Sequence, residues 1–196
     1  MSGPFEGAIG VIAAKVMARV NRDAEAEAVS RLDPAPGDRV LVLGFGPGIG
    51  VALLAERLAS GDVVGVDPSE TMARLATRRN LRAIGAGKVT LHAVRGDAIP
   101  AEAASFDGAV AVNTLQLCEP LAATAAELAR VLKPGASFVS LTHDWAIARS
   151  AGGVEAWIAA ARAAFAPAFE AIESGRGGAE KGRIVVFAGR RAPTDG

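Results

Sequence analysis

The stretch VLVLGFGPGIG, residues 40–50, decides the fold of this chain because it joins an aliphatic strand to a loop rich in glycine. Four of its last seven residues are glycine, and an amphipathic helix pattern follows at 51–60. Ligands of open α/β sheets bind beyond the carboxyl ends of the strands, usually at the first strand-to-helix turn. Gly44, Gly46 and Gly48 leave the backbone bare there, permit positive φ and free amide groups at a helix N-terminus. We therefore expect a carboxylate or a phosphate group at this loop.

The glycine spacing separates the ligands that such a loop can hold. The dinucleotide fingerprint G-x-G-x-x-G fails in both registers, since Ile49 or Val51 stands where its third glycine belongs. The P-loop pattern fails because no Lys-Ser or Lys-Thr pair follows the glycines. The pattern that remains, G-x-G-x-G, also suits a tight turn that binds nothing, so its meaning depends on the rest of the chain.

Predicted strands and helices alternate along the chain outside residues 40–50. Aliphatic runs predict strands at 39–43, 63–67, 89–94, 106–115, 136–143, 168–173 and 183–189. Apolar spacing and capping residues predict helices at 5–32, 51–60, 69–87, 121–135 and 154–166. The order βαβαβαβαβαββ predicts a Rossmann-like doubly wound α/β sheet of seven strands with helices on both faces. Because no helix separates the last two strands, the sheet should be mostly parallel with the last strand antiparallel.

The length of 196 residues suits a single domain. The segment DPAPGD, 33–38, separates an N-terminal helical arm, residues 1–34, from a ligand-binding domain, residues 35–196.

Two aspartates stand at the ends of the second and third predicted strands. Asp67 ends VVGVD, where a carboxylate can accept from both hydroxyls of a ribose. Asp97 follows the third strand in RGDA, where it can accept from an exocyclic amine. Taken singly, each aspartate is also typical of a turn or a helix cap. Together with the glycine loop they describe a site for a nucleoside that carries a carboxylate.

In this order the chain resembles the class I S-adenosylmethionine-dependent methyltransferases of the small UbiE-like and methyltransferase type 11 kind. The resemblance covers about residues 35–145, through VLVLGFGPGIG, VVGVDPSETM, RGDA, FDGAVAVNTLQ and ELARVLKPGASFV. It implies S-adenosyl-L-methionine as cofactor and S-adenosyl-L-homocysteine as product. The glycines at 44, 46 and 48 would line the methionine moiety, and Asp67 would bind the ribose. The resemblance further implies adenine contacts from Pro68, Ser69, Met72, Asp97 and Ala98, and places Asn113 near the methionine amino group and the transferred methyl.

The chain departs from this family at one position. Many relatives write the first motif V-L-D-L-G, with an acidic residue tied to the cofactor's ammonium group, where this chain has Val42.

Methyl transfer needs alignment of donor and acceptor, and for some acceptors a base. His143, followed by Asp144 after the fifth strand, is the candidate base at the rim of the crevice, with a solvated or core-edge histidine as the alternative. Gln116 and Glu119 are candidates for the acceptor side of the pocket. Met17 and Asn21 resemble a helical lid over the cofactor, although the arm also suits a helix packed on the sheet edge.

The amino-acid composition limits the classes of molecule that this chain is expected to bind. Lys+Arg and Asp+Glu both number 21, which gives no positive field for a nucleic acid or an anionic membrane. One cysteine and two histidines are too few for the common zinc patterns, so we expect no metal and a cytoplasmic location. The interrupted apolar run near the N-terminus predicts neither a signal peptide nor membrane insertion, and its Ile9–Val20 face could serve a homodimer.

We therefore expect methyl transfer from S-adenosylmethionine to O, N or C of a small organic acceptor. A non-methylating member of the family, acting in elimination, cyclisation or binding alone, is the alternative. A nicotinamide-dependent oxidoreductase is a third possibility, which the glycine spacing disfavours.

Overall fold

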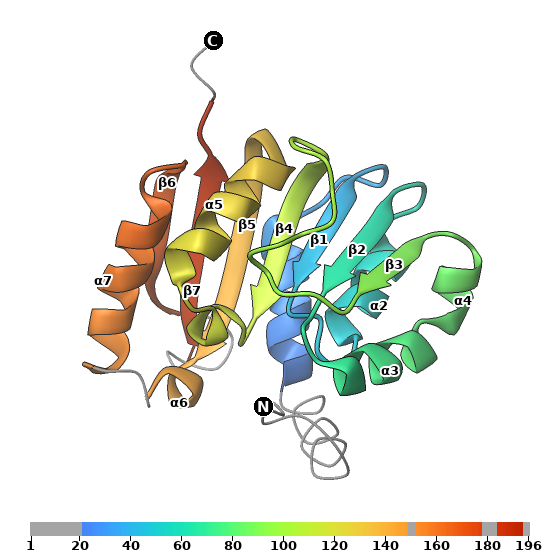
Figure 1. The fold of residues 1–196 in the computed structure, drawn as a ribbon, viewed down its shortest axis with the longest axis horizontal. Coiled ribbons are helices and arrows are strands. Elements are labelled where there is room, and N and C mark those ends of the chain that lie inside the picture. Colours follow the sequence, from blue (N-terminus) through green and yellow to red (C-terminus); the bar gives the residue numbers. More distant parts are fainter. Residues whose placement is uncertain (1–20, 149–151, 178–183, 194–196) are drawn as a thin grey trace.

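The computed structural model describes residues 21–148, 152–177 and 184–193, and these form one mixed sheet with helices on both faces (Figure 1). The seven strands are β1 Arg39–Leu43, β2 Asp62–Val66, β3 Val89–His92, β4 Phe106–Val112, β5 Leu132–His143, β6 Phe169–Gly177 and β7 Ile184–Arg191. Their spatial order is β3-β2-β1-β4-β5-β7-β6. The winding reverses beside β1, which pairs in parallel with both β2 and β4. The carboxyl end of β1 is therefore the place where a ligand is expected.

The predicted antiparallel last strand is confirmed. β7 lies between β5 and β6 and runs antiparallel to both, with Val139 opposite Ala188 and Ser174 opposite Phe187. Because the strand before it returns in the parallel direction, β7 is the insertion that makes the sheet mixed.

Helices cover both faces because the side chains of β1 alternate. Leu41 and Leu43 pack in the cluster that holds α5, Leu121–Val131, and α7, Gly153–Phe165. Val40 and Val42 pack on the opposite face, where α2, Ile49–Arg57, α3, Glu70–Arg79, α4, Leu81–Gly85, and the helical residues 21–32 lie (Figure 1). The short α6, Asp144–Ile147, and the 3-10 turn η1, Leu115–Leu117, complete the elements.

The helix predicted at 69–87 is two helices. Ser69 is the N-cap of α3, since its Oγ accepts from Met72 N at 3.3 Å. The chain then breaks at Asn80, whose side chain donates to the carbonyls of Gly48 at 3.1 Å and Ala76 at 2.9 Å. Asn80 thus satisfies the end of α3 and fixes it to the glycine loop, a long-range contact that no local pattern reveals. Of the helix predicted at 5–32, residues 21–32 are helical and the remainder lies outside the described residues.

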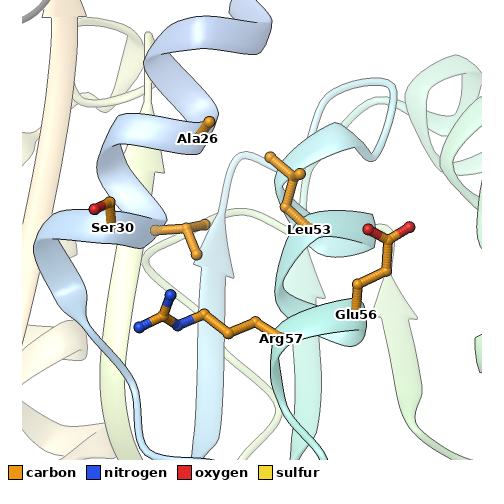
Figure 2. A pocket seen from close by; sticks show the side chains of 6 residues that line it. Ala26, Ser30, Leu53, Glu56 and Arg57 are labelled. Carbon is orange, nitrogen blue, oxygen red and sulfur yellow. The ribbon is translucent and has the colours of Figure 1, made fainter.

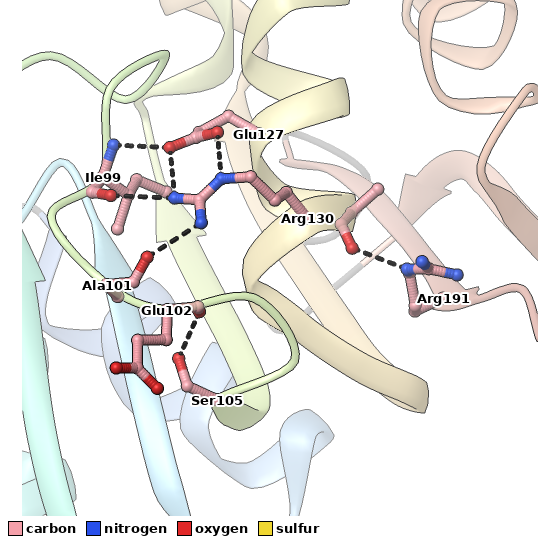
Figure 3. A network of polar contacts seen from close by, with 8 residues as sticks. Ile99, Ala101, Glu102, Ser105, Glu127, Arg130 and Arg191 are labelled. Carbon is pink, nitrogen blue, oxygen red and sulfur yellow. Dashed lines mark hydrogen bonds and ion pairs between the residues drawn. The ribbon is translucent and has the colours of Figure 1, made fainter. Parts of the chain in front are cut away.

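The predicted order βαβαβαβαβαββ counts a helix between the third and fourth strands, where no helical segment was identified in the sequence, and this part of the order is wrong. Residues 93–105 form a loop, and Glu127 and Arg130 of α5 satisfy its backbone (Figure 3). Glu127 accepts from Ile99 N at 2.8 Å, and Arg130 donates to the carbonyls of Ala101 at 2.8 Å and Ile99 at 3.0 Å. Side chains of a neighbouring helix therefore replace the hydrogen bonds that a helix would have made for itself.

We expect Arg130→Ala to lower the free energy of unfolding by about 2 kcal/mol, because two loop carbonyls and a carboxylate lose their donor at a partly exposed site. Arg130 lowers the pKa of Glu127 by hydrogen bonding, so this stability is present above the ordinary glutamate pKa and is lost as the pH falls through the lowered one. Thermal melts at pH 7 and pH 4 measure both effects. Arg74→Ala, which removes an exposed ion pair with Glu70 and one hydrogen bond to Thr71 within α3, is the control and should change the stability less. A loss at Arg130 no larger than at Arg74 would contradict the role given to the network.

Candidate cofactor and acceptor site

The glycine loop is held in a conformation that side chains would prevent. Gly44, Gly46 and Gly48 have φ of 70°, 48° and 81°, in the left-handed region. A Cβ on Gly44 would overlap the side chain of Thr114, and one on Gly48 would lie 2.7 Å from Asn80 Nδ2. A Cβ on Gly46 would meet nothing within 4 Å. The outer two glycines therefore serve close packing, while Gly46 leaves a bare backbone toward open space.

That open space is a cavity of about 560 Å³ at the carboxyl ends of β1, β2 and β4. Its volume lies in the range of small-molecule sites. Nine of the residues predicted for the site line it: Asn21, Gly44, Gly46, Asp67, Pro68, Ser69, Met72, Asp97 and Asn113. Gly48, Ala98, Gln116, Glu119, His143 and Asp144 lie outside this lining, and Met17 lies outside the described residues.

Asp67 ties two parts of the cavity wall together. Its Oδ2 accepts from Gly46 N and its Oδ1 from Ser69 N, both at 2.9 Å. Burial raises the pKa of Asp67, and these two hydrogen bonds oppose the rise. Each carboxylate oxygen keeps lone pairs beyond the one it uses, so Asp67 can still accept from a ligand hydroxyl.

Asp97 is held by a neighbour that the sequence reasoning missed. The guanidinium of Arg95 pairs with the Asp97 carboxylate at 2.8 Å and donates to the Glu119 carbonyl at 2.8 Å. Hydrogen bonding from Arg95 lowers the pKa of Asp97. Ala98 lies in the same turn through its amide, which donates to Arg95 O at 3.2 Å. Glu119 enters this arrangement through its backbone while its side chain is exposed.

Asn113 and Asn21, which line the cavity, form a buried polar network with His143, which does not line it. Asn113 Nδ2 donates to Asn21 Oδ1 at 2.9 Å and lies 3.0 Å from His143 Nδ1, and Asn113 Oδ1 accepts from His143 N at 2.8 Å. Asn113 has a φ of 51°, which turns its side chain into this network. Its own carbonyl accepts from Gln116 Nε2 at 2.7 Å, so Gln116 serves the turn after β4 rather than the cavity.

The predicted position of His143 at the rim is wrong. The side chain is 1% exposed and sits under Asn113, because β5 runs on to His143 and leaves it within the core. Asp144 does not carry out the orienting role expected of it, since α6 begins there and its carboxylate pairs with Arg176 of β6 at 2.8 Å. His143 is thus placed to hold Asn113.

The structure adds residues that the sequence reasoning passed over: Glu25, Pro47, Arg95, Thr114, Leu117, Cys118 and Thr124 line the cavity. Glu25 is the most unusual of them, because it is 8% exposed and burial raises its pKa to about 8. Helical spacing could have found it, since residue 25 lies one turn after Asn21 and one turn before Val29. Val42, the position where the family often has an acid, packs in the apolar core at 3% exposure.

A second depression lies between the helical residues 21–32 and α2 (Figure 2). Its volume is about 340 Å³ and it is lined by Ala26, Val29, Ser30, Leu53, Glu56 and Arg57. Arg57 is paired there with Asp33. None of its lining residues belongs to the cavity at the carboxyl ends of β1, β2 and β4, so we assign the chemistry to that larger cavity.

The described residues contain no cluster of His, Cys, Asp or Glu suited to a metal ion. In the same part of the chain no helix has both the length and the apolar character needed to cross a bilayer.

The comparisons agree with this geometry. Residues 40–135 match the family described as a methyltransferase domain. Nocamycin O-methyltransferase of Saccharothrix syringae is 38% identical over 104 residues, which cover 53% of this chain and 37% of that protein. O-methyltransferase cnsE of Penicillium expansum is 33% identical over 109 residues, covering 56% of this chain and 39% of that protein. The chain thus spans less than half the length of either relative.

Among solved structures, a SAM-dependent methyltransferase from Aquifex aeolicus superposes with a TM-score of 0.72 at 17% identity. The match covers 92% of this chain and 98% of that one, and at this identity it shows the fold alone.

The cavity suits the family's cofactor. Gly46 offers a bare backbone beside open space, Asp67 offers acceptors for hydroxyls, and Ser69, Met72 and Asp97 line the same cavity. With the ordered motifs, the matching domain and the mixed seven-stranded sheet, residues 40–135 of this chain belong to the class I S-adenosylmethionine-dependent methyltransferase domains, whose cofactor suits this cavity.

Proposed function

We propose that this chain transfers a methyl group from S-adenosylmethionine to a small organic acceptor, at an O, N or C atom and preferably at oxygen. One observation carries the proposal: groups from the ends of β1, β2 and β4 and from the loop after β3 meet in a single cavity of about 560 Å³. The names of two relatives as O-methyltransferases support the preference for oxygen.

Within this proposal each wall of the cavity has one part of the cofactor to hold. Gly44 and Gly46 line the methionine moiety, and Gly48 keeps the start of α2 against α3. Asp67 accepts from the ribose hydroxyls. The adenine lies among Pro68, Ser69, Met72, Asp97 and Ala98, with Arg95 fixing Asp97 in place.

The acceptor side lies past Asn113. Thr114, Leu117 and Cys118 line this end of the cavity, and Leu117 is 61% exposed at its mouth. Bound S-adenosylmethionine supplies an electrophilic methyl on a sulfonium, so these residues need to align the acceptor and exclude water. We propose that the arm, residues 1–34, acts as the lid, since Asn21 already reaches Asn113.

Two wider expectations belong to the same proposal. A cytoplasmic location follows from the single cysteine and from use of a metabolic cofactor. A homodimer through the Ile9–Val20 face remains a proposal, because that face lies outside the described residues.

The test is a methyl-transfer assay with the purified chain, methyl-labelled S-adenosylmethionine and a panel of phenols, carboxylic acids, amines and enolisable ketones. We expect label in a hydroxyl-bearing acceptor. Ser30→Trp fills the depression of Figure 2 and serves as the control, with a rate within about twofold of the wild type because that depression is not the site. Binding of S-adenosylmethionine with no transfer to any class would favour the non-methylating alternative.

A further inference from the structure

The carboxylate of Glu25 is buried at the cofactor cavity with no partner among the described residues. Glu25 lines the cavity at 8% exposure, and no hydrogen bond or ion pair joins its side chain to the described part of the protein. An unpaired carboxyl in such a place costs folding free energy, which a purely structural position would avoid.

The surrounding fold is shaped to hold this carboxylate. A Cβ on Gly50 would overlap Glu25 Oε2, so the glycine lets the carboxylate lie against the first turn of α2 in its observed position. On the same face of the sheet, Val42 packs with Ala24 and Ala28 in the apolar core. The arm therefore brings one ionisable carboxyl, negatively charged once it loses its proton, to the methionine end of the cavity, while β1 brings none.

The neighbouring groups leave that charge unbalanced. Asp67 is a second acid in the cavity wall, and Arg95 is held by Asp97. Cys118 lines the cavity with a pKa that burial raises, and His143 is turned to Asn113. On α2 the charged side chains, Glu56 and Arg57, lie two turns beyond Gly50, and Arg57 pairs with Asp33. Among residues 21–148, 152–177 and 184–193, no unpaired cation is therefore placed to balance Glu25, and a positive group on the ligand would do so.

We propose that Glu25 binds the ammonium group of the cofactor's methionine moiety, so that the N-terminal arm supplies the counter-charge for the amino-acid end. This assignment rests on the cofactor site proposed above. The ammonium is preferred to the sulfonium because its charge is unchanged by the reaction. A carboxylate against the sulfonium would stabilise a charge that the transition state loses, and would slow transfer.

Binding of the cofactor is then linked to the loss of a proton from Glu25. Since the pKa of Glu25 is about 8 without ligand, most molecules at pH 6 to 7 must release its proton when the ammonium binds. The affinity for S-adenosylhomocysteine should rise between pH 6 and pH 8, by up to about tenfold per unit.

Calorimetry with S-adenosylhomocysteine, S-adenosylmethionine and 5′-methylthioadenosine tests the assignment, because the last ligand lacks the amino-acid end. Glu25→Gln should weaken both amino-acid ligands by roughly 10- to 100-fold, leave 5′-methylthioadenosine within about twofold, and abolish proton release. Glu27→Gln removes a charge from the same helix at a residue paired with Arg31, and should match the wild type.

Thermal melting of the same proteins guards against misfolding. The folded protein holds the Glu25 proton more tightly than the unfolded chain, so its stability falls as the pH rises from about 4.5 through about 8. Glu25→Gln removes this loss, and at pH 8.5 without ligand it should melt roughly 5 °C or more above the wild type.

The outcomes separate cleanly. Equal affinity of wild type and Glu25→Gln for S-adenosylhomocysteine overturns the assignment, as does an equal loss for 5′-methylthioadenosine. A loss confined to S-adenosylmethionine overturns it in favour of the sulfonium. If the wild type binds none of the three ligands, the proposed function itself fails.

Discussion

Replacing Asp67 by alanine is expected to weaken S-adenosylmethionine and S-adenosylhomocysteine by at least about 100-fold, because it removes a carboxylate with two roles. Its oxygens accept from the ribose in the proposed complex, and without ligand they accept from Gly46 N and Ser69 N. The change therefore deletes a charged acceptor and loosens the loop and the cap of α3 at the same time. Losses of about 1.5–3 kcal/mol are typical when a single hydrogen bond to a charged group is removed.

Two further variants separate these roles. Asp67→Asn keeps one acceptor oxygen and should retain part of the binding. Asp62→Asn, at the other end of β2, removes a carboxylate that pairs with Arg39, and should bind like the wild type.

Calorimetric titration of the three variants with both ligands and with NADH measures the effect, and melting curves report the fold. The wild type could bind NADH tightly and S-adenosylhomocysteine not at all, with Asp67→Ala abolishing the NADH binding. That result would support a nicotinamide-dependent oxidoreductase instead. Unchanged S-adenosylhomocysteine binding in Asp67→Ala would show that Asp67 does not bind the ribose.

Local patterns predicted those parts of the structure that spacing and composition along the chain decide. Ser69 caps α3 because its hydroxyl is three residues from the amide it satisfies, and that spacing is visible in SETM. The strands of the sheet and the antiparallel β7 were predicted from runs of aliphatic residues and from the missing helix before the last strand.

The predictions are wrong where contacts with residues distant in the sequence fix the local conformation. The break at Asn80 depends on the Gly48 carbonyl, and the loop at 93–105 depends on Arg130. His143 was expected at the rim because strand ends face the crevice, yet its ring turns inward to Asn113, thirty residues away in the sequence. Glu25 was missed because a glutamate in a charged helix predicts a solvated face, and only its spacing from Asn21 and Val29 marks it as buried.

Gly48→Ala is expected to be strongly destabilising, by roughly 3 kcal/mol or more. Gly48 has a φ of 81°, and its Cβ would lie 2.8 Å from Ala76 Cβ and 2.9 Å from Ala76 Cα. The Cα belongs to the backbone of α3, which cannot rotate away, so the added methyl must push α3 from α2. Left-handed φ alone costs about 1–2 kcal/mol for a residue with a Cβ.

Gly46→Ala should separate stability from binding. Its φ of 48° carries a similar backbone cost, but nothing lies within 4 Å of its Cβ, so no packing is lost. The methyl instead enters the cavity where the cofactor's methionine moiety is expected. Gly46→Ala should therefore melt well above Gly48→Ala while binding S-adenosylhomocysteine at least about tenfold more weakly than the wild type.

Gly85→Ala is the matched control, because residue 85 ends α4 with open space at its Cβ and should tolerate the methyl in both measurements. If Gly48→Ala has the same melting temperature as Gly85→Ala, α3 moves to accommodate the methyl group more easily than its contacts with the loop imply. If Gly46→Ala binds as tightly as the wild type, the bare backbone at 46 serves the turn and not the ligand. Since Gly46 N also donates to Asp67, that result would leave the loop's glycines with the structural task of bringing β1 and β2 into register at the cavity wall.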